Sequence, residues 1–249
     1  MRKFKSIFFL YAAIVSADVL GASSDEIQVY DDAINKPGEA SVDLHVNYVP
    51  SGVKVPAYGG EIPAHHNLRI TPEFAYGLNK NWEFGFYLPV IRAATGDWHV
   101  EGAKVRLKYM ANNPEQGFYW GINSELGASS HRTEESNWNF ELRPIIGYKT
   151  DNWNLTVNPI LGMALSGNTH TPTFSPALKV SRKVAEKTWF NVEHYSEFGP
   201  VNDLRSLVQE TYLTMDTEAF GHDINFGVGH GWTVGSNDWT LKAILNFPF

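Results

Sequence analysis

The sequence contains no cysteine among its 249 residues. Neither a disulfide framework nor a thiolate metal site can form, so an exported form of the chain depends on packing and strand pairing for its stability. Basic residues are the minority, with 20 Lys and Arg against 27 Asp and Glu. Because nucleic-acid binding requires clustered Lys and Arg to neutralise phosphates, this balance argues against nucleic acid as a partner.

Long apolar runs are also absent beyond the N-terminus. No later stretch approaches the roughly 18 apolar residues that a membrane helix requires. The first residues, MRKFKS and then IFFLYAAIV, form a basic segment followed by an apolar one that is too short to span a bilayer. This arrangement is typical of a secretory signal peptide. The small residues nearby suit cleavage after Ala17 or after Ala22, and we assign residues 1–22 to the signal peptide.

The sequence is rich in period-two alternation of apolar and polar residues. In residues 102–110, for example, apolar residues from Ala103 to Tyr109 alternate with three basic ones. Segments with one apolar and one polar face are typical of half-buried strands. The pattern predicts twelve strands, at residues 40–49, 67–78, 82–91, 102–110, 118–128, 137–148, 153–164, 174–182, 189–197, 207–216, 222–232 and 239–249.

Such a series of two-faced strands predicts an all-β protein, a transmembrane antiparallel up-and-down β-barrel of about 12 strands. An even strand number returns both ends of the barrel to one side, which we expect to be the periplasm. Alternate connections differ in length as this arrangement requires. The longer ones are residues 50–66, 129–136, 165–173 and 198–206, and short turns lie at 79–81, 112–114 and 150–152. Tryptophans at both ends of the predicted strands, such as Trp82 and Trp138, indicate two aromatic girdles.

The two ends of the mature chain differ in character. Residues 23–39 are acidic and end at a Pro37-Gly38 break, so we expect a short periplasmic arm or plug, or else a disordered tail. Residues 40–249 are assigned to the barrel. The last predicted strand carries Leu245, Phe247 and Phe249 at alternate positions. It is similar to the insertion signal that the barrel assembly machinery recognises in outer-membrane proteins.

Three groups of residues resemble a family of proteobacterial outer-membrane β-barrel proteins of uncharacterised function. They are EIQVYDD (26–32) with PGE (37–39), TPEFAYGL (71–78) with Trp82, and ELRPIIG (141–147). More loosely, the chain is similar to transporter-like barrels of aromatic-degradation operons. The resemblance implies a location in the outer membrane of a Gram-negative bacterium, with outer-membrane lipids, lipopolysaccharide and the assembly machinery as partners and a small solute as cargo. It supplies no catalytic or binding motif.

Charged residues on the polar faces of the strands are the candidate site residues, because the lipid-facing side of a barrel is apolar and the polar side faces the lumen. These lumen-lining residues are Arg69, Glu73, Glu83, Lys104, Arg106, Lys108, Glu125, Glu141, Arg143, Glu193, Asp223 and Lys242. The basic row from Lys104 to Lys108 could attract anions into an aqueous pore while the carboxylates repel them. Alternatively, pairs of opposite charge neutralise one another and seal the lumen. Twelve strands lie between filled and open barrels, so the strand number leaves both alternatives open.

A histidine and a serine of one predicted strand are candidates for enzymatic chemistry. His194 and Ser196 are two residues apart on one strand face, which suits base activation of a serine, and the pattern resembles that of the lipid A deacylase barrels. Those enzymes have Asn where this chain has Glu197, the orienting carboxylate would have to be Glu210, and the chain has about four strands more than that family. The remaining histidines are dispersed and lack metal-ligand spacing, so no metal site is predicted.

The sequence therefore favours a passive outer-membrane channel or transporter for small solutes, with neither cofactor nor enzymatic chemistry. A closed structural or adhesive barrel is the alternative. A lipid A deacylase-like hydrolase that uses His194 and Ser196 is a further one.

Overall fold

The computed structural model describes residues 26–249, and these residues form strands, turns and loops. Within this range no helix has the length and apolar character needed to cross a bilayer. The predicted signal peptide, residues 1–22, lies outside the described residues.

Seventeen strand segments form one antiparallel sheet that closes on itself. In chain order they are β1 (Ala40–Ser51), β2 (Leu68–Gly77), β3 (Trp82–Tyr87), β4 (Val90–Arg92), β5 (Trp98–Val100), β6 (Gly102–Met110), β7 (Gly117–Ser129), β8 (Trp138–Lys149), β9 (Trp153–Asn158), β10 (Leu161–Ala164), β11 (Thr173–Phe174), β12 (Ala177–Ala185), β13 (Thr188–Glu197), β14 (Gly199–Pro200), β15 (Val208–Ala219), β16 (His222–Gly231) and β17 (Trp239–Pro248).

Ten of these segments pair up as halves of interrupted strands, which gives a closed barrel of twelve strands. The interrupted strands are β3/β4, β5/β6, β9/β10, β11/β12 and β13/β14, because the two halves of each follow one another in the chain and share at least one neighbouring strand of the barrel. Three of the interruptions contain a proline, namely Pro89, Pro159 and Pro176. Proline has no N–H to donate to a neighbouring strand, so the ladder breaks locally while the strand continues in the same direction.

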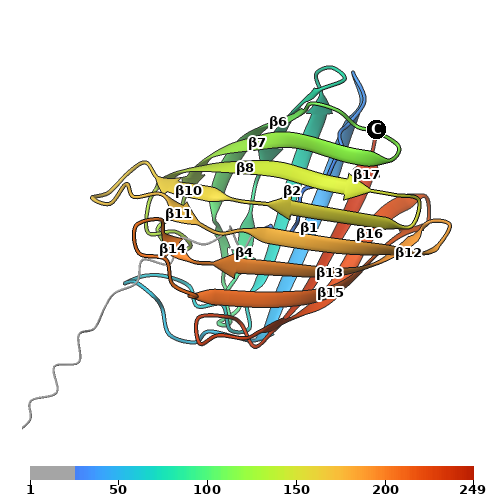
Figure 1. Cartoon of the computed structure of the whole chain (residues 1–249). Coiled ribbons are helices and arrows are strands. Elements are labelled where there is room, and N and C mark those ends of the chain that lie inside the picture. Colours follow the sequence, from blue (N-terminus) through green and yellow to red (C-terminus); the bar gives the residue numbers. More distant parts are fainter. Residues whose placement is uncertain (1–25) are drawn as a thin grey trace, which may run out of the picture.

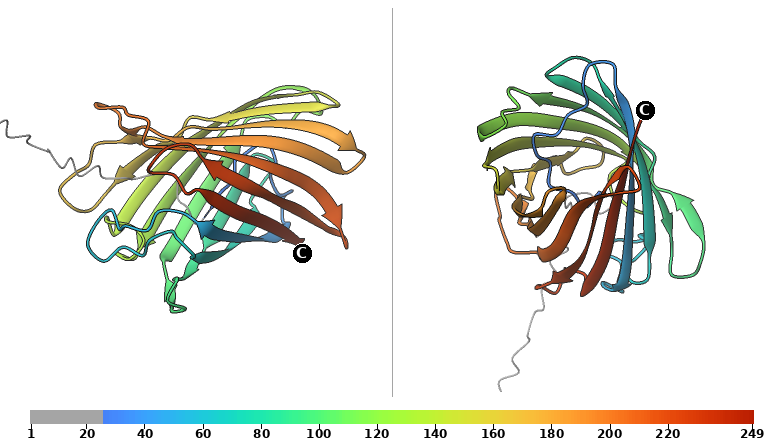
Figure 2. Two further views of the ribbon diagram at one scale, coloured as in Figure 1. Left: turned by 90° about the horizontal axis from the view of Figure 1, so that it is seen from below. Right: turned by 90° about the vertical axis from the view of Figure 1, so that its right-hand side faces the viewer.

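The barrel closes between the first and the last strand. β1 pairs with β17 from Ser41 opposite Pro248 to Tyr48 opposite Leu241, and it pairs with β2 on its other edge. Figures 1 and 2 show the strands tilted around a common axis, with the blue β1 beside the red β17. The predicted fold class, a twelve-strand antiparallel barrel, is confirmed.

Connections at the two ends of the barrel differ in length. We call the end with the short turns, such as residues 78–81 and 220–221, the turn end, and the opposite end the loop end. Two predicted boundaries are wrong at the loop end. Residues 98–100 form β5, because the hairpin of β4 and β5 continues the ladder beyond the predicted strand. Residues 199–200, predicted to lie in a loop, form β14 and pair with β11.

The two faces of the barrel wall differ in polarity. Outward side chains are apolar and exposed, as in Phe84, which is 43% exposed, and Trp120, which is 47% exposed. Inward side chains are mostly polar and buried, as in Asn123, at 0%, and Glu193, at 1%. This inversion of the usual soluble arrangement is what a bilayer requires of a barrel, since the outer surface contacts hydrocarbon and the inner surface contacts water or other polar groups.

Residues 26–39, which we call the arm, run inside the barrel. Glu26, Val29 and Tyr30 are each less than 5% exposed. The arm reaches the turn end at Gly38, whose φ of +83° allows the chain to reverse into β1. Gly38 N–H donates to the Gly77 carbonyl over 2.8 Å, which fixes this turn against the end of β2. Figure 2 (right) shows the blue arm passing within the ring of strands.

Candidate functional site

Arg106 is the centre of the first of three charged clusters in the lumen. Its guanidinium donates from Nε to Glu73 Oε1 over 2.6 Å and lies 2.7 Å from Glu83 Oε1 through Nη2. On the other side of Glu73, the His45 imidazole contacts Oε2 at 3.2 Å. β1, β2, β3 and β6 are neighbours, so alternation alone brings these four inward side chains together. We call them the Arg106 cluster.

Arg143 is the centre of a second cluster, which joins the barrel wall to the arm. Its Nε donates to Glu141 Oε1 over 2.8 Å, and its Nη1 lies 3.6 Å from Glu26 Oε1. Lys104 lies 3.5 Å from Glu125 and 3.9 Å from Glu26. Glu26 therefore lies between two cations of different strands. We call these five residues the Arg143 cluster.

The third cluster lies on the opposite wall, around Glu193 of β13. Lys242 Nζ donates to Glu193 Oε2 over 2.7 Å, and Lys179 Nζ lies 4.0 Å from Glu193 Oε1. Lys179 also donates to Asp216 over 2.9 Å. Because Glu193 and Lys242 are each at most 3% exposed, the pair is secluded from bulk water. Removing one partner of such a buried pair leaves the other charge buried and unpaired, which costs about 3–5 kcal/mol of folding stability.

The remaining predicted lumen residues lie apart from these clusters. Arg69 donates from Nε to Glu101 over 2.9 Å near the loop end. Lys108 Nζ donates to the Ala33 carbonyl of the arm over 2.6 Å. Asp223 lines a cavity near the turn end. The structure thus places all twelve predicted lumen side chains on the inner face. The basic row does not form a continuous anion-attracting surface, because carboxylates or the arm engage each of its three members.

Tyr30 is the main anchor of the arm. Its hydroxyl lies 2.5 Å from the Tyr87 hydroxyl, and its backbone N–H and carbonyl both bond the Asn158 side chain, at 2.7 and 2.9 Å. The guanidinium of Arg143 lies 4.4 Å from the centre of its ring, within the range of a cation–π contact. Tyr30 also packs against buried Met110, among other side chains of the wall. The arm is therefore held against one side of the lumen, formed by β3 and β6–β9.

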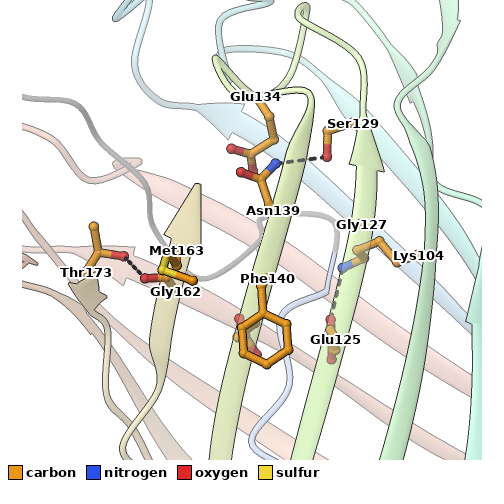
Figure 3. Close-up of a pocket in the computed structure, with 11 residues that line it drawn as sticks. Lys104, Glu125, Gly127, Ser129, Glu134, Asn139, Phe140, Gly162, Met163 and Thr173 are labelled. Atoms are coloured by element: carbon orange, nitrogen blue, oxygen red, sulfur yellow. Dashed lines mark hydrogen bonds and ion pairs between the residues drawn. The ribbon is translucent and has the colours of Figure 1, made fainter. Parts of the chain in front are cut away.

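Cavities remain elsewhere in the lumen. In the loop half, a cavity of about 150 Å³ lies between β1/β2 and β13/β15, and we call it the loop cavity. In the turn half, a cavity of about 450 Å³ lies between the arm and β12–β17, and we call it the turn cavity. A cavity of about 240 Å³ adjoins the turn cavity. Another cavity, of about 70 Å³, lies on the β7/β8 wall of the loop half. Figure 3 shows its lining, where Lys104 faces Glu125 and Asn139 bonds Ser129.

His194 and Ser196 lie on the outward face of β13, and they do not form a nucleophile–base pair. Ser196 Oγ donates to Gln209 Oε1 over 2.8 Å, and His194 Nε2 contacts the same oxygen at 3.0 Å. The other imidazole nitrogen, Nδ1, contacts Thr211 Oγ1 at 2.9 Å. Since activation of a serine requires its hydroxyl to donate to the base, this arrangement leaves the serine unactivated. The carboxylate suggested as an orienting group, Glu210, instead accepts from Tyr212 on the inner face.

Sequence reasoning missed several lumen residues. His45, Lys179 and Asp216 lie on strands that were predicted, at positions of the polar face, so strand parity could have identified them. Glu26 and Tyr30 lie in the arm, which has no alternation. The hydrogen-bond partners of Tyr30 lie 57 and 128 positions away in the sequence, and no local pattern indicates them.

A scan against models of protein families gave no match, and a search of curated protein sequences gave none either. Solved structures do match. An outer membrane channel from Pseudomonas putida F1 is similar over 90% of this chain and 100% of its own, with a TM-score of 0.64 and 10% identity. The KdgM porin matches over 84% and 99%, with a TM-score of 0.54 and 13% identity. The NanC porin matches over 82% and 97%, with a TM-score of 0.52 and 11% identity. At such identities the likeness shows a shared fold.

Proposed function

We propose that this protein is a passive outer-membrane channel for small solutes. One observation carries the proposal: cavities with charged side chains in their linings occupy both halves of the lumen, between the arm and the wall of β13, β15 and β17. The loop cavity and the turn cavity both lie along β13, β15 and β17. Glu193 and Lys242, which pair at 2.7 Å, line the turn cavity, and Tyr195 of the loop cavity donates to Glu193, so these side chains border both spaces.

The outer face supports the proposed location in the outer membrane. It carries an apolar band with tryptophans at each end, such as Trp153 at the turn end and Trp138 at the loop end, each about half exposed. The fold shared with the outer membrane channel and the two porins supports the same location. Cleavage of a signal peptide after residue 22 belongs to the proposal and would be read by N-terminal sequencing of the exported protein. The assembly machinery and lipopolysaccharide as partners stay predictions.

Single-channel recording tests the proposal. Protein refolded in detergent is first shown to migrate faster on a gel before boiling than after, which reports a closed barrel. It is then inserted into planar bilayers. We expect discrete current steps of small unitary size, because the arm and the ion pairs fill part of the lumen. Folded protein that leaves the bilayer silent would contradict the channel.

A closed structural barrel is the second candidate, and one observation favours it. The three charged clusters and the arm cross the lumen with side chains that are almost entirely buried. In a barrel of this kind the same groups act as filling rather than as a pore lining. The two candidates differ in the recording described above, where a closed barrel gives no current.

A further inference from the structure

The lumen has more carboxylates than it has cations to pair with them. All Lys and Arg side chains that line the loop and turn cavities are engaged, as in Arg69 with Glu101 and Lys242 with Glu193. Several carboxylates in the same cavities have no ion pair within residues 26–249. They are Glu197 and Glu210 in the loop cavity and Asp31, Asp43 and Asp223 in the turn cavity. In their ionised form these carboxylates make the field along this wall negative, which raises the local concentration of cations.

The loop cavity presents hydrogen-bond acceptors that no group of residues 26–249 satisfies. Asn67 is 0% exposed and lines this cavity, and its Oδ1 has no hydrogen-bond partner in the described part of the chain, whereas its Nδ2 bonds the Pro63 carbonyl. Glu197 Oε2 likewise has no partner there. Glu26 also lines the cavity, and within residues 26–249 neither of its oxygens accepts a hydrogen bond and the ion-pair contacts are at 3.6 and 3.9 Å. A buried acceptor without a hydrogen bond costs free energy, and a ligand rich in hydrogen-bond donors would remove that cost.

Aromatic rings form another part of the same cavity. Tyr195 and Tyr212 lie edge to face, with ring centroids 5.4 Å apart, and both line it. Their hydroxyls donate to Glu193 and Glu210, both over 2.7 Å. The electron-rich faces of such rings attract ammonium and guanidinium groups. Carboxylates, the unpaired amide oxygen of Asn67 and tyrosine rings together are complementary to an organic cation.

An inorganic ion fits less well. Divalent metals require several oxygen or nitrogen ligands that converge on one point. Within residues 26–249 no group of three His, Asp or Glu residues is placed to hold one. The volume of about 150 Å³ is also larger than a bare ion requires and suits a small organic molecule.

We infer that the loop cavity is a binding subsite for small organic cations, primary amines above all, and that the lumen selects such cations over anions. The inference rests on the proposed channel function and adds the class of solute. A protonated amine would donate to Asn67 and Glu197 in the loop half. It would then meet the carboxylates of the turn cavity after passing the Glu193–Lys242 pair.

Calorimetry on the full-length protein in detergent tests the subsite without requiring conduction. The probes are n-butylammonium, 1-butanol and butyrate, which have similar chains and differ in charge. We expect saturable binding of n-butylammonium alone. Glu197→Gln should weaken it at least about fivefold, because a carboxylate about 4 Å from an ammonium contributes 1 kcal/mol or more. This variant loses no hydrogen bond at Oε2, so its fold should survive. Glu115→Gln, in an exposed turn, removes the same charge outside the lumen and should bind as the wild type does.

Recording in a KCl gradient tests the selectivity. We expect a reversal potential that shows preference for potassium. In the double variant Glu197→Gln with Glu210→Gln, the cation-to-anion permeability ratio should fall roughly fivefold to tenfold at moderate salt. Butyrate that binds as well as n-butylammonium, or a conducting channel that prefers chloride, would overturn the inference while leaving the channel intact. A silent bilayer would overturn the channel, and the calorimetry would then decide the subsite alone.

Discussion

Replacing Tyr30 with alanine is expected to release the arm from the lumen wall. The Tyr30 side chain is only 4% exposed, so its loss forfeits most of the burial of an aromatic ring, about 3–5 kcal/mol. The hydrogen bond to Tyr87 adds about 1 kcal/mol and the contact with Arg143 about 0.5–1 kcal/mol. The total, about 4.5–7 kcal/mol, corresponds to an increase of roughly a thousandfold or more in the ratio of undocked to docked arm.

Two measurements read this change. In planar bilayers the unitary current should rise, or fluctuate between two levels, because the undocked arm no longer narrows the turn half. Cleavage by a protease specific for acidic residues should accelerate at Asp31 and Asp32, since local opening exposes the backbone. Tyr30→Phe is the matched control. It keeps the ring and the contact with Arg143 and loses only the hydroxyl, so its effect should be smaller by at least tenfold. Unchanged current together with unchanged cleavage in Tyr30→Ala would refute the assignment of Tyr30 as anchor.

Three further predictions follow from the lumen and the outer face. Arg106→Leu should destabilise the barrel by about 3–5 kcal/mol, since it leaves two buried carboxylates without their cation. A urea titration that follows the fast-migrating gel band of the folded barrel would show a lower midpoint. Gly147→Ala should cost about 1–3 kcal/mol, because the new Cβ would overlap the Tyr119 ring, whereas Gly59→Ala, with no atom nearby, should be neutral in the same urea titration. Overexpression of the wild type and of His194→Ala should give identical mass spectra of lipid A, and loss of an acyl chain with the wild type alone would show deacylase activity.

Alternation predicted the barrel well because it is a local property. Each strand of residues 40–249 has its own apolar and polar face, and the face fixes which side chains point inward. The twelve lumen residues follow from that parity. Interruptions such as the one at Pro159 were not predicted, since a strand that breaks its ladder and then resumes keeps its alternation.

The charge pairing and the course of the arm could not be read in the same way. Whether Arg106 faces a carboxylate or an open pore depends on which strands are neighbours and on how they are shifted relative to one another. The arm has no periodic pattern, and its position depends on distant partners such as Asn158 and Tyr87. The width of the lumen depends on these side chains. The strand number alone is therefore equally compatible with an open barrel and with a filled one.

The position of the arm has a consequence for how the molecule is made. Tyr30 bonds Asn158 across 128 positions and Asp32 bonds Lys149 across 117, so neither contact can exist before about half of the barrel strands have been synthesised. Closing a loop of such length costs more conformational entropy than forming a local contact does. The first described residues in chain order are thus expected to be among the last to reach their final positions. Folding intermediates should expose a hollow, unoccupied interior, and the time between wall formation and arm docking is when the interior is widest.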